Sequence, residues 1–138
     1  MDQQHRRIVN PSGVSPPLGR YSHLARVRAG ELLFLAGQVA VDLEGNVVGE
    51  GDVAAQVGQV YENIGRVLKS AGASFGDVVQ FTTYLTGREL VDPFLEARTK
   101  IVVGLYPDGD FPPSTLLIVS GLFSEQLLLE VTTVAAFA

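Results

Sequence analysis

One stretch, residues 52–72, contains the clearest helix pattern in the chain and separates its strand-like segments into two groups. Apolar residues recur there at steps of three and four, which is the spacing of one face of an amphipathic helix. Asp52 is suited to the N-cap of this helix, and Gly72 to the position that follows its last turn. We interpret Gly58 and Gly65, seven residues apart, as points where the helix closely approaches a sheet.

Apolar and β-branched segments on both sides of this helix predict strands. A glycine and an asparagine within residues 43–47 favour a hairpin turn, because both tolerate positive φ. The last two strands are predicted to be joined by a short turn near Ser124. The segments expected to be strands are 21–28, 31–41 and a short third strand after the turn at 43–47 before the helix, and 78–86, 114–122 and 127–137 after it.

A second helix is predicted to begin at Asp92, as N-cap, with Pro93 in the first turn, and to run over 94–105. The order β-β-β-α-β-α-β-β then predicts one α+β domain over residues 1–138, a mixed β-sheet with both helices on one face. The strands carry too many apolar residues for the other sheet face to contact water. We therefore expect that face to pack against other subunits.

Composition and charge support an oligomer and limit the possible partners. Hydrophobic residues make up 46% of the chain and charged residues only 18%, too few to cover the surface of a monomer well. Residues 1–28 hold five arginines and one acid, a net charge of +4, whereas the remainder carries −9 of the overall −5. The acidic body should repel nucleic acid, and we interpret the arginine-rich start as a solvated arm.

Several classes of site are excluded by residue type. The chain has no cysteine and two histidines, so thiol nucleophiles and cysteine- or histidine-rich metal sites are not expected. The polar start has no apolar stretch after it, and no segment is long and apolar enough to span a bilayer. We therefore expect a cytoplasmic protein with no metal and no membrane partner.

Few side chains stand out as catalytic by themselves. Glu130 is the only acid between Glu125 and the end of the chain, and it falls in a predicted strand. A buried strand carboxylate can serve as a general acid or base, although most strand carboxylates are simply exposed. His23 shares a strand face with Tyr21, but we interpret it as a surface histidine.

Five segments in register, spread from Ile8 to Ala135, resemble the RidA family, also called the YjgF or endoribonuclease L-PSP family. The resemblance implies a chorismate-mutase-like fold and a homotrimer with ligand clefts between subunits. It also implies hydrolysis of amino-acid-derived enamines and imines to a 2-keto acid and ammonia, without a cofactor. The segments are Asn10-Pro-x-Gly with Tyr21 after it, LAGQV at 35–39, the helix at 52–72, the strand region 76–86, and FPPST at 111–115.

The sequence departs from this family where substrate binding is implied. The family's arginine, which holds the substrate carboxylate, falls at Ser114, its cysteine at Leu116, and its second-helix asparagine at Leu95. A serine cannot hold a carboxylate as a guanidinium does, so we expect neutral or weakly polar ligands. Arg98, one helical turn beyond Leu95, is a candidate replacement cation, although a helix arginine is more commonly at the surface.

The resemblance also supplies the candidate site residues. The acid of the family's last strand falls at Thr132, or at Glu130 if the alignment slips by two residues. The catalytic candidates are therefore Tyr21, Ser114, Thr132 and Glu130. The residues expected to line the cleft between subunits are Tyr21, Ala36, Gly37, Leu95, Arg98, Ser114, Thr115 and Leu116.

The sequence thus predicts a RidA-like homotrimer whose cleft takes a small carbonyl, imine or enamine metabolite, and which is not a standard 2-imino-acid deaminase. One alternative is an imine or enamine deaminase, a hydrolase, that works without the usual arginine. Another is a non-catalytic ligand-binding or regulatory module.

Overall fold

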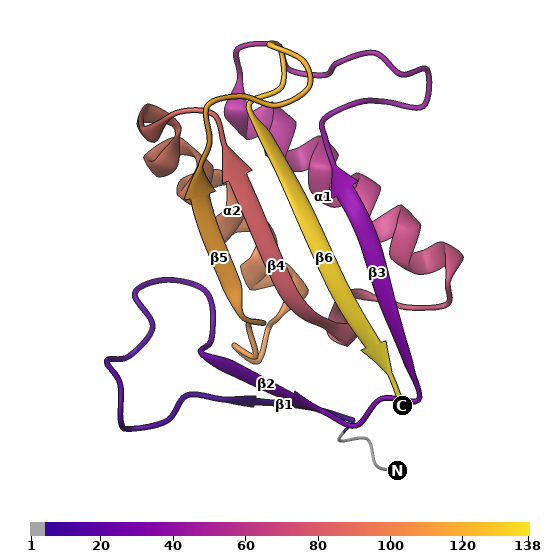
Figure 1. The fold of residues 1–138 in the computed structure, drawn as a ribbon, viewed down its shortest axis with the longest axis vertical. Coiled ribbons are helices and arrows are strands. Elements are labelled where there is room, and N and C mark those ends of the chain that lie inside the picture. The colour runs from indigo at the N-terminus through magenta and orange to yellow at the C-terminus, as the bar shows by residue number, and fades with distance from the viewer. Residues whose placement is uncertain (1–4) are drawn as a thin grey trace.

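The computed structural model describes residues 5–138 and contains a four-stranded sheet, a separate two-stranded ribbon and two helices (Figure 1). Short 3-10 turns, Phe75–Asp77 and Arg88–Leu90, precede β4 and α2. In chain order the elements are β1 Arg6–Val9, β2 Leu24–Val27, β3 Glu31–Gln38, α1 Val53–Ser70, β4 Val78–Leu85, α2 Val91–Leu105, β5 Ser114–Ile118 and β6 Leu129–Phe137.

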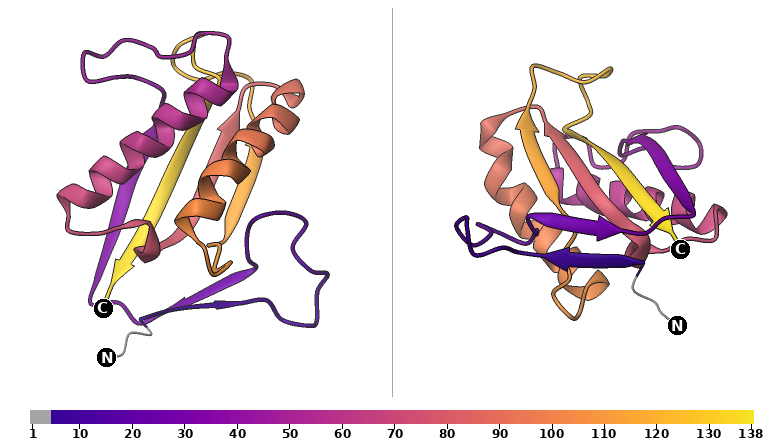
Figure 2. Two further views of the ribbon diagram at one scale, coloured as in Figure 1. Left: turned by 180° about the vertical axis from the view of Figure 1, so that it is seen from behind. Right: turned by 60° about the horizontal axis from the view of Figure 1, so that its bottom comes forward.

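The sheet is mixed and has the order β3-β6-β4-β5. Strand β6 is antiparallel to both β3 and β4, whereas β5 is parallel to β4 because α2 carries the chain back between them. Both helices lie on one face of the sheet, and the β1–β2 ribbon crosses below its end (Figure 2). The predicted α+β class, with two helices on one face of a mixed sheet, is confirmed.

The core lies between the two helices and the face of the sheet that they cover. Asp52 caps α1 by accepting a hydrogen bond from the backbone N–H of Ala55, and Gly72 ends it with φ +79°, both as predicted. The buried face of α1 packs on β6 and β3 and against α2, and the Tyr61 ring of α1 contacts Phe81 of β4. Its fully buried residues include Val57, Val60, Ile64 and Leu68.

Four expectations about local structure are wrong. Strands β5 and β6 are not paired, because residues 119–128 carry the chain across the end of β4, where Val119 and Leu128 both hydrogen-bond to it. Helix α2 begins at Val91 after a 3-10 turn, not after an N-cap at Asp92. A side chain at Gly58 would meet no atom within 4 Å, whereas one at Gly65 would lie 3.1 Å from the ring of Phe75, which is not in the sheet.

The fourth concerns the arginine-rich start, which is partly ordered as β1 rather than a solvated arm. Arg6 Nε donates to the carbonyl of Val78 (2.7 Å) and Nη2 to that of Asp110 (2.9 Å), and its guanidinium lies 5.7 Å from the centre of the Tyr106 ring. Burial lowers the pKa of Arg6. These contacts attach the ribbon to the base of the sheet.

Gln56 joins α1 to two loops, and its loss should strongly destabilise the fold. Its fully buried amide Nε2 donates to the carbonyls of Gly49 (3.1 Å) and Gln126 (2.9 Å), and Oε1 accepts from the N–H of Leu128 (2.9 Å). Gln56→Leu would leave these backbone groups unpaired, so we expect the free energy of unfolding to fall by about 3 kcal/mol.

Chemical denaturation measures this effect. Gln59→Leu is the matched control, because Gln59 makes its side-chain hydrogen bond to Asn63 within the same helix. It should lose less than about 1 kcal/mol. Equal losses of unfolding free energy in the two variants would show that the hydrogen bonds from Gln56 to the loops do not stabilise the fold.

The sheet face opposite the helices carries exposed apolar side chains. Leu32 and Phe34 on β3 are 49% and 74% exposed, and Leu117 on β5 is 45% exposed. We call this surface the open face. A surface of this kind is typical of a subunit interface, and the homotrimer stays a prediction.

Candidate functional site

A cavity of about 320 Å³ lies between α2, the helix-facing side of β4 and β5, and the loop before β2. Its lining includes five residues that the sequence predicted for the ligand cleft: Tyr21, Leu95, Arg98, Ser114 and Leu116. Thr83 and Leu116 are register partners in the parallel pair β4–β5, so they face the cavity side by side. The other lining residues are Leu18, Gly19, Arg20, Thr83 and Phe94.

Arg98 is the feature of this cavity that the sequence predicted least well. It was expected at the surface of α2, but it is only 4% exposed. Its Nε donates to the hydroxyl of Tyr61 (3.2 Å) and its Nη1 to the carbonyl of Arg20 (3.0 Å). The third nitrogen, Nη2, is buried and has no hydrogen-bond partner among residues 5–138. The guanidinium is thus fixed by two contacts, and both N–H groups of Nη2 are left for a ligand.

Neither of these contacts neutralises the charge of Arg98. Burial raises the pKa of Tyr61, so its hydroxyl stays protonated and neutral while it accepts from Arg98. No carboxylate lines the cavity, and none pairs with Arg98 in the described part of the chain. A buried cation without a counter-charge costs several kcal/mol unless an anion joins it, so this geometry favours an anionic ligand.

Thr83 adds a second unpaired polar group to the same cavity. The residue is 1% exposed, and its Oγ1 has no partner among the described residues. Its hydroxyl and Arg98 Nη2 can both donate to one carboxylate. Sequence analysis missed Thr83, because a threonine in a β-branched strand is indistinguishable from a packing residue without the register.

Substituting Thr83 by valine separates packing from ligand binding. Thr83→Val removes a buried unpaired hydroxyl at nearly constant shape, so stability should stay equal or rise while affinity for a carboxylate ligand falls about tenfold. Thr133→Val is the matched control: Thr133 is also 1% exposed with an unpaired Oγ1, but it does not line the cavity. Calorimetric titration with a 2-oxo acid should leave the control unchanged. A loss of affinity in both variants would contradict a ligand role for Thr83.

Tyr21 lies in the loop that covers one side of the cavity. Its hydroxyl accepts a hydrogen bond from the N–H of Leu18 (3.2 Å) and remains free to donate to a ligand. The His23 ring packs edge-on against the Tyr21 ring, with the two ring centres 5.9 Å apart, and His23 Nε2 lies 2.8 Å from the carbonyl of Ser15. His23 is exposed, as expected, and it organises this loop.

The remaining predicted site residues do not line this cavity in the single chain. Thr115 pairs with Thr82, and Thr82 pairs with Thr132. These residues alternate with the strand residues that face the helices, so they lie on the opposite side of the sheet. The Glu130 carboxyl lies directly over Gly37, so a side chain at position 37 would collide with it. Ala36 is exposed beside it on β3. These five residues, Ala36, Gly37, Thr115, Glu130 and Thr132, form a second group.

Two classes of feature are absent from the part of the chain that the structure describes. No helix there is long and apolar enough to cross a membrane. Within residues 5–138, no three His, Asp or Glu side chains gather where they could hold a metal ion.

Comparison with known proteins identifies the family of the chain. Residues 13–137 match the family described as endoribonuclease L-PSP. The chain belongs to this family, which is also known as the Rid family. A RutC family protein of Pyrococcus abyssi is 34% identical over 130 residues, covering 94% of this chain and 96% of that protein.

Two further Rid relatives bear on fold and chemistry. The crystal structure of YyfB from Yersinia pestis, a Rid protein of unknown function, has a TM-score of 0.87 and 32% identity, covering 97% of this chain and all of that chain. The 3-aminoacrylate deaminase RutC of Acinetobacter baylyi is 29% identical over 130 residues, covering 94% of this chain and 97% of that protein. The Rid fold that the sequence resemblance implied is therefore confirmed.

Proposed function

We propose that this Rid-family protein hydrolyses a small enamine or imine that bears a carboxylate, and that Arg98 holds the carboxylate. This is the alternative in which a deaminase works without the arginine expected at Ser114. The observation that carries it is the buried Arg98 guanidinium, which lines the cavity and whose Nη2 has no hydrogen-bond partner among residues 5–138. The expectation of neutral ligands assumed an uncharged cleft, and Arg98 removes that assumption.

In this proposal the guanidinium that holds the carboxylate comes from a different wall of the cavity than in the family pattern. In the family pattern it is carried at the position of Ser114, on β5; here it is carried by α2, and Ser114 and Leu116 form the β5 wall. Because the side chain of Ser114 is small, it leaves space beside the β5 wall, and Arg98 faces this space from across the cavity. A carboxylate there would accept from Arg98 Nη2 and from the Thr83 hydroxyl.

The reaction follows from the chemistry of such a substrate. An enamine first becomes its imine tautomer by gaining a proton at carbon and losing one from nitrogen. Water then adds to the imine carbon, the carbon–nitrogen bond breaks, and the products are a 2-keto acid and ammonia. Arg98 and Thr83 orient the substrate, and the apolar side chains of Phe94, Leu95 and Leu116 surround its carbon end and limit access of bulk water. The imine carbon is already electrophilic, so we propose no cofactor.

The step that activates water needs a base that the cavity lacks in one chain. Its lining contains no carboxylate and no histidine. We propose that residues 1–138 form one domain that assembles as a homotrimer through the open faces. In this assembly Glu130 and Gly37 of a neighbouring subunit complete the cleft, with Glu130 as the general base. Glu130 is preferred to Thr132 because a threonine cannot accept a proton near neutral pH.

A trapping assay tests the proposed function. An amino-acid oxidase generates a 2-imino acid, and semicarbazide captures whatever imine remains, so hydrolysis by the protein lowers the semicarbazone signal. We expect the protein to clear 2-iminopropionate faster than buffer does. An imine of similar size without the carboxylate, made from a simple amine and aldehyde, should show no acceleration. The proposal would be contradicted if the protein accelerated the hydrolysis of neither imine.

A non-catalytic binding module is the second candidate. The absence of a base from the cavity lining of the single chain favours it. In that case a 2-oxo acid binds through Arg98, but the imine decays at the rate seen in buffer.

A further inference from the structure

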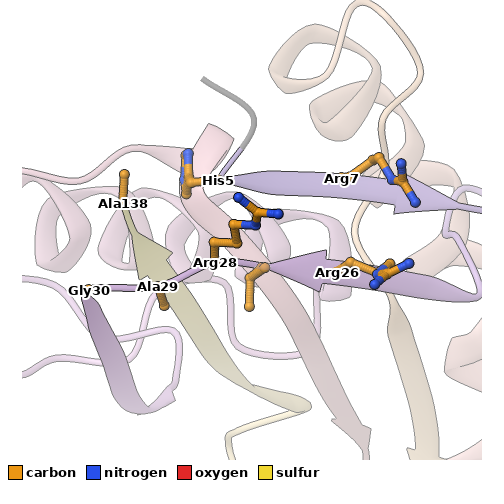
Figure 3. Close-up of a pocket in the computed structure, with 8 residues that line it drawn as sticks. His5, Arg7, Arg26, Arg28, Ala29, Gly30 and Ala138 are labelled. Carbon is orange, nitrogen blue, oxygen red and sulfur yellow. The ribbon is translucent and has the colours of Figure 1, made fainter. Parts of the chain in front are cut away.

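We propose that one face of the β1–β2 ribbon binds a compact polyphosphate anion, at a site separate from the cavity beneath α2. Four basic side chains line a hollow of about 870 Å³ on this ribbon, together with Val27, Ala29, Gly30 and Ala138 (Figure 3). Their positions follow from the strand register, and none of them takes part in the function proposed above. We call His5, Arg7, Arg26 and Arg28 the basic face.

The register puts all four on the same side of the ribbon. Arg7 pairs directly with Arg26 in the antiparallel ladder, and Arg28 N–H donates to the carbonyl of His5 (2.8 Å), which makes the next rung. Residues two apart on one strand share a face, as do directly opposed residues. Arg6, between His5 and Arg7, points the other way, where Val78 and Asp110 bind it.

The three arginines of the basic face have no counter-charge in the described chain. His5 Nε2 lies 3.2 Å from a carboxylate oxygen of Asp77, whereas no ion pair to Arg7, Arg26 or Arg28 occurs within residues 5–138. All three arginines are exposed. Two like charges directly opposite each other destabilise a strand pair. An anion between them removes that cost and gains charge-assisted hydrogen bonds.

The dimensions of the basic face fit a short polyanion. Opposed side chains start about 5 Å apart, and the two rungs are about 7 Å apart along the strands. Three guanidinium groups over this area match a diphosphate or triphosphate group, to which arginine binds through two parallel N–H groups. A hollow of this size is within the range of small-molecule sites.

Nucleic acid fits this surface less well. No phenylalanine, tyrosine or tryptophan lines the hollow, so the large aromatic rings on which successive bases stack are missing from it. The acidic remainder of the chain, with its net charge of −9, would repel an extended polyanion that leaves the ribbon. A compact anion stays within the basic face and avoids this repulsion.

Calorimetric titration with inorganic triphosphate at low ionic strength tests the proposal. We expect saturable binding that Arg7→Gln with Arg26→Gln weakens at least tenfold. Without triphosphate, the same double variant should unfold at a higher temperature than the wild type, because it relieves the like-charge pair. The matched control is Arg66→Gln with Arg88→Gln, which makes the same charge change at exposed positions elsewhere. It should bind triphosphate normally.

Four outcomes would overturn the proposal. They are no binding by the wild type, an equal loss in both double variants, equally tight binding of a single-stranded oligonucleotide of the same charge, and a change in assembly mass when Arg7 and Arg26 are replaced. The last would mean that the basic face is a subunit contact. Arg98→Met should leave triphosphate binding unchanged, so failure here is separate from failure of the proposed hydrolase activity.

Discussion

Arg98→Met should lower kcat/KM for 2-iminopropionate at least about a hundredfold and, at the same time, raise the unfolding temperature. The loss of activity follows from removing the buried cation that lines the cavity, since Arg20, which also lines it, is exposed. The gain in stability follows because methionine fills much of the same volume without burying a charge that no carboxylate pairs with in the described residues. A fall in activity together with a rise in stability would indicate that Arg98 serves ligand binding rather than folding.

The matched control for this variant is Arg66→Met. Arg66 is on α1, exposed and paired with Glu62. It should change activity by less than about twofold and stability by less than about 0.5 kcal/mol. If Arg98→Met instead unfolds the protein, the main role of Arg98 is structural, through its hydrogen bonds to Tyr61 and Arg20. In that case Arg98→Lys, which keeps the charge, should fail to restore substrate affinity.

Two inactive variants should regain activity when they are mixed in one trimer. Glu130→Gln removes the proposed base and Arg98→Met the carboxylate anchor, and each alone should be at least about a hundredfold slower than the wild type. If each cleft takes Arg98 from one subunit and Glu130 from the next, co-expression restores both groups in about a quarter of the clefts. Activity of the co-expressed trimer should therefore be about a quarter of wild type.

Assembly and activity measured together give the control. Light scattering should show three times the mass of one chain for the wild type and for both variants. Phe34→Glu, on the open face, should dissociate the trimer and abolish activity, whereas Leu43→Glu, equally exposed in the turn before α1, should do neither. Full activity of Glu130→Gln, or no recovery on co-expression, would contradict a shared cleft.

The parts of the fold that were predictable are those set by local chemistry. The periodicity of residues 53–70, the Asp52 cap and the positive φ of Gly72 all follow from residue type and spacing. Pairing between strands is set by long-range geometry instead. No local pattern indicates that residues 119–128 cross the end of β4, which puts β6 rather than β5 beside β3.

The site divides in the same way. Tyr21, Leu95, Ser114 and Leu116 were predicted from the family resemblance, and the structure brings them to one cavity. Arg98 was named as a candidate but expected at the surface, because α2 has a weak pattern of apolar residues that leaves its buried side ambiguous. Thr83 could not be identified without knowing that β5 lies parallel beside β4 and turns both strands toward α2.

Titration of the protein with 2-oxobutyrate, a keto acid of the product class, tests the role of Arg98 most directly. The wild type should bind it saturably in calorimetry, Thr133→Val should bind it equally well, and Arg98→Met should bind it at least about a hundredfold more weakly. Equal affinity of the wild type and Arg98→Met would contradict the assignment of Arg98 as the carboxylate anchor.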